Sequence, residues 1–276
     1  MDYKTLLVHL ELNGDNSGLL AIAGDLAQRF GARVIGIAAA QPIQILYEEG
    51  WVAGEVLNRD REETGKEIAA CEAQFRKALE GRAAAVEWRS AITYEPLADY
   101  IADQSRCADL IITGKDIGGA FLDNTRRVNV GSLAMQAGRP ILIVPKGVTE
   151  LPMRHVFVAW KDSREARRAV WDALPLLAAA GRATVLEVAP KDACAAAQAR
   201  VADTARWLER HGVSATPMTV ASGGIEAGQL HAELLDRKCD LLVAGAYGHS
   251  RVGEWVFGGV TLDMLLDPDF CVLISH

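Results

Sequence analysis

Several residue patterns that mark particular protein classes are scarce or missing in this chain. Cysteine occurs five times in 276 residues, an odd number, and no two cysteines form a Cys-x-x-Cys pair. Disulfide frameworks need paired cysteines, so this usage favours a reducing compartment. We expect the cysteines that fall in helix or strand patterns to be buried small apolar residues: Cys71, Cys107, Cys239 and Cys271.

Positive charge and long apolar runs are also sparse. The net charge is −7 and no segment is rich in lysine or arginine, so a nucleic-acid partner is not expected. The mixed-sign clusters at 59–63 and 164–168 predict solvated helix faces. No apolar run approaches the roughly 18 residues that span a bilayer, and the first residues lack a signal-peptide pattern. We therefore expect a cytoplasmic protein without a membrane partner.

Recognisable catalytic and metal motifs are missing as well. The six histidines show no zinc-like spacing with a cysteine or another histidine, and His-Glu-x-x-His is absent. Neither a Gly-x-Ser-x-Gly elbow nor a Gly-x4-Gly-Lys-[Ser/Thr] loop occurs. We predict no metal site and no catalytic residue, and we expect that the chain is not an enzyme.

What the chain does contain is an internal repeat, in which each half begins with a buried strand, at 4–10 and at 154–160. A helix with an apolar stripe follows, at 19–30 and at 166–177. The later segments follow in the same order: strands 33–38 and 183–188, helices 55–80 and 192–211, strands 85–91 and 214–220, helices 95–106 and 226–238, strands 107–114 and 239–245, and strands 140–145 and 271–276.

Strands that alternate with helices predict a mostly parallel sheet with helices on both faces. The fold class expected is α/β, with two tandem doubly wound domains. We place the first domain at 1–147 and the second at 152–276, because the stretch between them carries proline, glycine and threonine.

A glycine-rich loop follows strand 239–245 in the second half and reads GAYGHSRVGEWVFGGVT over 245–261. Glycine lets a backbone approach phosphate closely, and a helix N-terminus favours negative charge. In an open parallel sheet a ligand lies where the strand order reverses, so the loop after Trp160 should join this site. Lys161, His249 and Arg251 would add positive charge. The same glycines also suit a plain turn.

These residues resemble the universal stress protein family, whose signature is Gly-x2-Gly-x9-Gly-[Ser/Thr]. Gly245, Gly248 and Gly258 match its three glycines at the required spacing. The segment 163–166 also resembles the family's first strand-to-helix turn, and the resemblance covers the whole chain twice. It implies flavodoxin-like domains, a cytoplasmic role in the stress response and, in many members, binding of ATP.

The resemblance also implies a set of binding residues for ATP, AMP or another adenine nucleotide. Gly245 and Gly248 would line the phosphate turn, and the Gly258–Gly259–Val260 backbone would reach the phosphates. Residues expected to flank the adenine and ribose are Ala159, Trp160 and Lys161, with Val188 and Val220 as apolar contacts to the base.

The chain departs from the family pattern in both halves. Gly259 stands where the signature has serine or threonine, and Thr261 is a candidate replacement two residues on. Lys161 stands where the family has an acidic residue. In the first half, Ile117 falls at the second glycine while Glu11 keeps the acidic character, so we interpret this half as a degenerate, structural site.

Three functions are compatible with these patterns. The leading hypothesis is a stress-response regulatory module that binds a nucleotide through the second half. The alternative is a nucleotide-free scaffold of the same fold, and the third is a weak ATP-hydrolysing or adenylyl-transfer enzyme. In the family, domains pair through their last strands, so 140–145 and 271–276 are expected to pair within one chain, and two chains to form a homodimer.

Overall fold

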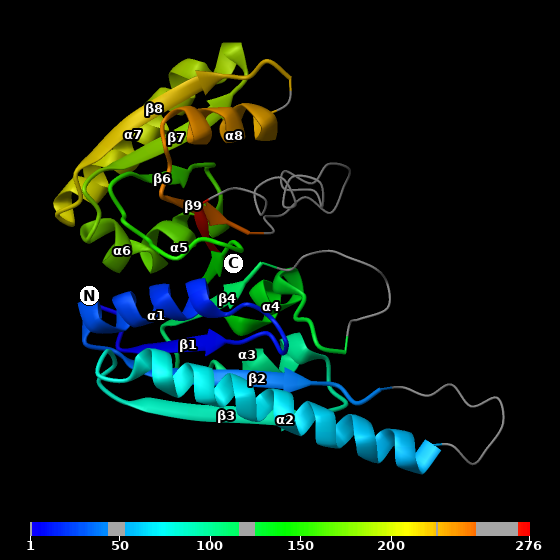
Figure 1. Cartoon of the computed structure of the whole chain (residues 1–276). Coiled ribbons are helices and arrows are strands. Elements are labelled where there is room, and N and C mark those ends of the chain that lie inside the picture. Colours follow the sequence, from blue (N-terminus) through cyan, green and yellow to red (C-terminus); the bar gives the residue numbers. More distant parts are fainter. Residues whose placement is uncertain (1, 44–52, 116–124, 225, 247–269) are drawn as a thin grey trace. The chain divides into compact units, whose positions relative to one another are not determined.

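The computed structural model describes residues 2–43, 53–115, 125–224, 226–246 and 270–276. The chain divides into two compact units, one of residues 3–137 and one of residues 138–276 together with residues 1–2 (Figure 1). The domain limits 1–147 and 152–276 stay a prediction. Within the described residues, no helix is both long and apolar enough to cross a bilayer.

The first unit alternates strands and helices in the predicted order (Figure 1). Its elements are β1 (Thr5–His9), α1 (Ser17–Phe30), β2 (Arg33–Ala40), α2 (Ala53–Leu79), β3 (Val86–Ile92), α3 (Leu97–Gln104), β4 (Leu110–Gly114) and α4 (Val130–Ala137). All pairings are parallel and the strand order is β3-β2-β1-β4. The central strands β1, β2 and β4 are buried almost throughout, as expected for strands covered on both faces.

The second unit repeats this plan and begins with the strand that ends the first half. Its elements are β5 (Ile141–Val144), β6 (Val156–Ala159), α5 (Arg164–Asp172), α6 (Leu174–Ala178), β7 (Ala183–Ala189), the 3-10 turn η1 (Lys191–Ala193), α7 (Cys194–Arg210), β8 (Ala215–Ala221), α8 (Glu226–Asp236), β9 (Leu241–Gly245) and β10 (Cys271–Ser275). The order is β5-β10-β9-β6-β7-β8. The α/β, flavodoxin-like fold class is confirmed.

The last strands of the two halves pair as predicted. β10 runs antiparallel to β5, with Leu273 opposite Leu142 and Ile274 opposite Ile141, and parallel to β9 on its other side. Residues 272–274 are almost fully buried. The terminal strand is therefore an interior strand of its sheet.

The repeat extends to side-chain contacts. One carboxylate oxygen of Asp109, before β4, accepts the backbone N–H groups of Lys4 at 2.7 Å and Thr5 at 2.9 Å. Asp240, before β9, accepts those of Arg154 at 2.6 Å and His155 at 2.9 Å. In both halves an aspartate thus fixes the start of the first strand beside the fourth.

One predicted helix is broken. The apolar stripe over 166–177 predicts a single helix, but α5 ends at Asp172 and α6 begins at Leu174. Pro175 lies in the first turn of α6. Proline has no N–H and its ring clashes with the carbonyl four residues earlier, so it is tolerated in a first turn and not in a helix interior.

Candidate functional site

The ends of β6 and β9 meet where the strand order of the second unit reverses. β6 pairs with β9 on one side and with β7 on the other, and Ala159 lies opposite Ala244. The residues that follow, Trp160 and Gly245, therefore leave the sheet from neighbouring strands at the same edge. This is where open parallel sheets place a ligand, and the structure brings Ala159, Trp160 and Gly245 together there.

Gly245 has a steric requirement that its sequence position did not reveal. A Cβ at this residue would lie 2.5 Å from the backbone nitrogen of Ala166 and 2.5 Å from the carbonyl carbon of Glu165. Real Cβ atoms do not approach backbone atoms that closely. The first turn of α5 thus packs directly on the end of β9, and only glycine fits between them.

The first turn of α5 is capped from within the chain. The hydroxyl of Ser163 accepts the N–H of Ala166 at 3.2 Å, as a serine N-cap should. Arg164 Nε donates to the Glu165 carboxylate at 3.0 Å. These contacts use positive charge and N–H groups that a ligand anion would otherwise meet at this helix end.

Glu165 itself is a buried carboxylate, 3 % exposed, at the helix N-terminus. Burial alone raises the pKa of Glu165, but hydrogen bonds from its own amide, Ser163 and Arg164 outweigh it and hold the pKa below the ordinary value. The expectation of a solvated face at 164–168 is wrong for this residue. Arg164, Arg167 and Arg168 are exposed as expected.

Trp160 presents an unpaired polar atom beside the strand ends. Its backbone N–H donates to the carbonyl of Leu186 at 2.7 Å, so it continues the β6 ladder. Its indole Nε1 is buried and has no hydrogen-bond partner among the described residues. Buried donors are almost always paired. We therefore expect the indole N–H to have an acceptor outside the described part of the chain.

Thr219 carries a second such atom on the same face of the sheet. Its hydroxyl is buried without a partner in the described ranges. Thr219 lies opposite Glu187, and side chains of register partners share a face. Ala159 lies opposite Leu186, so the alternation places Trp160 on the Glu187 face as well. Between the two orphan atoms Glu187 is held by Arg200 of α7, whose Nε lies 3.2 Å from the carboxylate.

The other predicted contacts are placed as follows. Lys161 is exposed in the loop after β6. Val188 and Val220 are register partners on β7 and β8, on the face opposite Glu187 and Thr219. Both are half-buried and neither lies on a strand next to β9, because β6 separates β7 from β9, and β6 and β7 separate β8 from β9. Their contact with a base stays a prediction.

Most of the glycine loop lies outside the described residues. This applies to Gly248, His249, Arg251, Gly258, Gly259, Val260 and Thr261, whose roles remain predictions. Among the residues that the structure does describe, no group of three or more histidine, cysteine, aspartate or glutamate side chains is gathered as metal ligands.

The corresponding place in the first unit is built differently. A Cβ at Gly114, at the end of β4, would lie 3.2 Å from the Glu11 carboxylate. A carboxylate thus lies where the second unit has the backbone of α5. The α1 N-cap, Asn16, makes no side-chain capping bond and instead exchanges hydrogen bonds with the Glu11 backbone at 3.0 Å and 2.9 Å.

The cysteines follow the expectation except at one position. Cys71, Cys239 and Cys271 are buried, whereas Cys107 is exposed. Burial raises the pKa of Cys271 to about 12, and it also raises the pKa of Cys239. Thiols that stay protonated are poor nucleophiles, which suits packing roles for these two. Cys107 falls in the turn between α3 and β4 and not within either element.

Comparisons with known proteins find likeness at the level of structure. No protein-family model and no curated protein matches the sequence. A universal stress protein from Archaeoglobus fulgidus DSM 4304 matches with a TM-score of 0.75 and 14% identity, over 99% of this chain and 96% of that one. A protein described as functionally unknown, from Pseudomonas aeruginosa PAO1, gives a TM-score of 0.64 at 14% identity over 99% and 92%.

A third structure comes from Pseudomonas aeruginosa UCBPP-PA14 and was assigned provisionally to the universal stress proteins. It matches with a TM-score of 0.65 at 14% identity, over 99% of this chain and 93% of that one. Identity this low shows the fold and not the activity. The resemblance in the glycine signature is thus joined by a likeness in three dimensions, and the chain has the fold of the universal stress proteins along its whole length.

Proposed function

We propose that this chain is a regulatory protein of the stress response that binds an adenine nucleotide, ATP or AMP, at the ends of β6 and β9. The observation that carries the proposal is the pairing of Ala159 with Ala244 at the reversal of strand order. It sends both predicted binding loops out of one edge of the sheet. The indole N–H of Trp160 at that edge, which has no partner among the described residues, supports it.

The contacts of α5 orient the ligand in this proposal. The first turn of α5 is capped by Ser163 and carries the buried Glu165 carboxylate, so it repels phosphate. The phosphates therefore belong on the glycine loop that begins at Gly245. The base or ribose belongs beside Trp160, where the indole N–H has an acceptor to gain. Lys161 is exposed and supplies positive charge near the open end of the site.

The test is calorimetric titration of the nucleotide-stripped protein with ATP and with AMP. We expect one site per chain in the second half. Gly248→Val should abolish binding, while Gly118→Val in the loop of the first half should leave it unchanged. Trp160→Phe keeps an aromatic ring but loses the indole N–H, and it should weaken binding by roughly tenfold, which corresponds to about 1.4 kcal/mol.

The alternative functions predict other results. A nucleotide-free scaffold would give no heat and would release no nucleotide when the freshly purified protein is denatured. An ATP-hydrolysing or adenylyl-transfer enzyme would convert ATP to product in the same sample, whereas we propose binding without turnover. Product analysis after incubation with ATP separates the last two cases.

Assembly and location belong to the same proposal. We expect two chains to form a homodimer in the cytoplasm, with a small-molecule nucleotide as ligand and neither nucleic acid nor membrane as partner. Sedimentation at high protein concentration tests the assembly, and a strict monomer would contradict it.

A further inference from the structure

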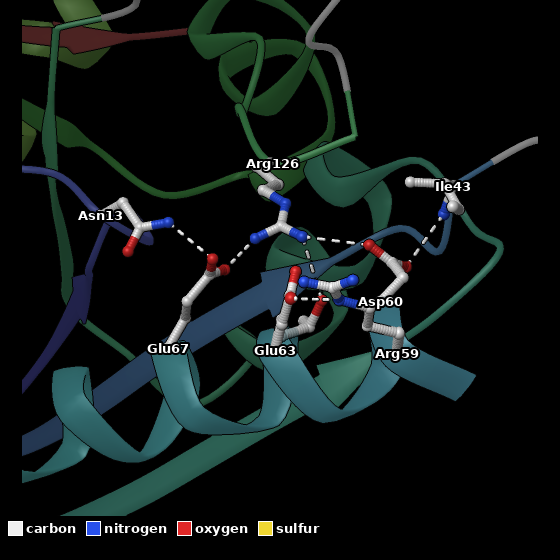
Figure 2. A network of polar contacts seen from close by, with 8 residues as sticks. Asn13, Ile43, Arg59, Asp60, Glu63, Glu67 and Arg126 are labelled. Carbon is white, nitrogen blue, oxygen red and sulfur yellow. Dashed lines mark hydrogen bonds and ion pairs between the residues drawn. The ribbon is translucent and has the colours of Figure 1, made fainter. Parts of the chain in front are cut away.

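Arg126 is the centre of a polar network in the first unit (Figure 2). It lies between β4 and α4, and its guanidinium reaches three side chains of α2. One nitrogen lies 3.2 Å from the Asp60 carboxylate and 3.1 Å from the Thr64 hydroxyl, and another bonds the Glu67 carboxylate. Positions 60, 64 and 67 follow helical spacing, so one face of α2 supplies all three partners.

The same carboxylates also hold the segments that follow β1 and β2. The Asn13 side chain donates to Glu67 at 2.6 Å, and the backbone N–H of Ile43 donates to Asp60 at 3.2 Å (Figure 2). β1, β2 and β4 are parallel, so their carboxyl ends lie at one edge of the sheet. This network connects the segments that follow β1, β2 and β4 to α2. We call it the Arg126 clasp; its members are Asn13, Ile43, Asp60, Thr64, Glu67 and Arg126.

The clasp is partly withdrawn from water. The side chains of Arg126, Asp60 and Glu67 are 20 %, 11 % and 19 % exposed, and Thr64 is buried. Charges in such a setting are screened weakly by salt and depend on their partners. One guanidinium facing two carboxylates leaves these three side chains with a net charge of −1.

We propose that the Arg126 clasp closes the first unit to anionic ligands. Arg126 acts as a built-in cation whose charge is already matched by Asp60 and Glu67. Among the described residues of the clasp, a phosphate would meet two carboxylates and a guanidinium that already pairs with both of them. The clasp therefore places a cation together with its own counter-charges at this edge of the first unit, and this holds whether or not the second unit binds nucleotide.

The proposal predicts that an anion site appears when the carboxylates are neutralised. Asp60→Asn combined with Glu67→Gln keeps the shape of both side chains and leaves the charge of Arg126 unmatched. In titration with inorganic pyrophosphate and with ATP, this variant should bind one equivalent per chain more than the unaltered protein. Its affinity at the edge of the first unit should be at least tenfold higher than that of the unaltered protein. Adding Arg126→Gln should remove the gain.

Either of two results would overturn the proposal. The first is a folded Asp60→Asn/Glu67→Gln protein, checked by circular dichroism, that binds no more anion than the unaltered chain. The second is a gained equivalent that survives Arg126→Gln. Because the readout is a difference between variants, it stays informative if the second unit proves unable to bind nucleotide.

A measurement on the unaltered protein covers the case in which the double variant does not fold. Phenylglyoxal modifies accessible arginines, and the sites are found by mass spectrometry. Arg126 should react at least tenfold more slowly than Arg59, which is exposed on α2 and pairs with Glu63. Millimolar ATP should not change the rate at Arg126. Protection of Arg126 by ATP would show that anions do enter this edge.

Discussion

Gly245 is a single residue with two separate reasons to be glycine: its predicted role in the phosphate turn and its contact with α5. Its Cα lies under the first turn of α5, and a Cβ would meet two backbone atoms at 2.5 Å. We expect Gly245→Ala to lower the free energy of unfolding by about 1–3 kcal/mol, the usual cost of overpacking. Urea unfolding measures it.

A second glycine provides the matched control for that substitution. Gly65 lies in α2, is exposed, and has nothing within 4 Å of its would-be Cβ. Gly65→Ala should raise the free energy of unfolding by up to about 1 kcal/mol, because alanine favours the helix. Equal effects of both substitutions would show that the contact with α5 is not what Gly245 is required for.

His9 makes stability depend on pH. Its Nδ1 lies 3.0 Å from the Thr113 hydroxyl, and burial lowers the pKa of His9 from 6.5 to about 4. On His9, the unfolded chain takes up a proton near pH 6.5 and the folded chain only near pH 4. Neutral His9 therefore costs no stability above about pH 6.5, and the free energy of unfolding decreases as the pH falls from 6.5 towards 4. Between pH 7 and 5 we expect a loss of about 2 kcal/mol.

The contribution of His9 can be isolated with one variant. His9→Asn removes the titrating group and keeps a partner for Thr113, so its free energy of unfolding should fall less between pH 7 and 5. Other titrating groups, such as His155, whose pKa burial also lowers, act in both proteins and cancel in the difference. An unchanged pH dependence in His9→Asn would contradict the assignment.

At the scale of an element, α5 depends on its N-cap. Ser163 accepts the N–H of Ala166 and donates to Glu165, so Ser163→Ala leaves both groups short of a partner. We expect a loss of about 1–2 kcal/mol in the free energy of unfolding, and Ser163→Thr should restore most of it. Thermal unfolding compares the three proteins, and an alanine variant as stable as the threonine one would refute the role.

Most elements could be predicted from the sequence because each carries its own signal. The apolar run at 271–276 is β10, and the stripe in 192–211 is α7. Glu165 and Arg126 could not be predicted in this way. Glu165 sits in a mixed-sign cluster that local pattern assigns to solvent, and its burial depends on β9, about 80 positions later in the chain. Arg126 meets partners 59 to 66 positions away.

The candidate site was predicted in part for the same reason. Residues at strand ends, such as Ala159 and Gly245, follow from strand order, which the repeat makes readable. Val188 and Val220 were chosen by the family resemblance. Their distance from β9 across the sheet follows only from the observed strand order.

In the whole molecule, the contacts of β5 assign it to the second unit, although its residues come from the first half of the repeat. A separate chain of residues 138–276 would end its sheet on β5, a four-residue strand between Pro140 and Pro145. Short strands and prolines protect a sheet edge. A chain of residues 152–276 would instead bare β10, whose residues Val272, Leu273 and Ile274 are buried in the full chain.

We therefore expect residues 138–276 to give a monodisperse protein and residues 152–276 to associate. Size-exclusion chromatography with light scattering distinguishes the two. Monomeric behaviour of 152–276 at high concentration would mean that the β10 edge needs no partner. A second variant, Leu273→Lys in 152–276, should reduce the association, since an edge charge opposes strand pairing.

The pairing of β5 with β10 also affects how mutations act on the two halves of the repeat. In an assembly of two identical chains, each mutation changes both copies, and a site can be lost only in both at once. Here the last strands of the two halves meet within one chain, so each half accumulates its own substitutions while the pairing itself is retained. Such a chain is free to give up one site, as we propose for the first half, and to adapt the other.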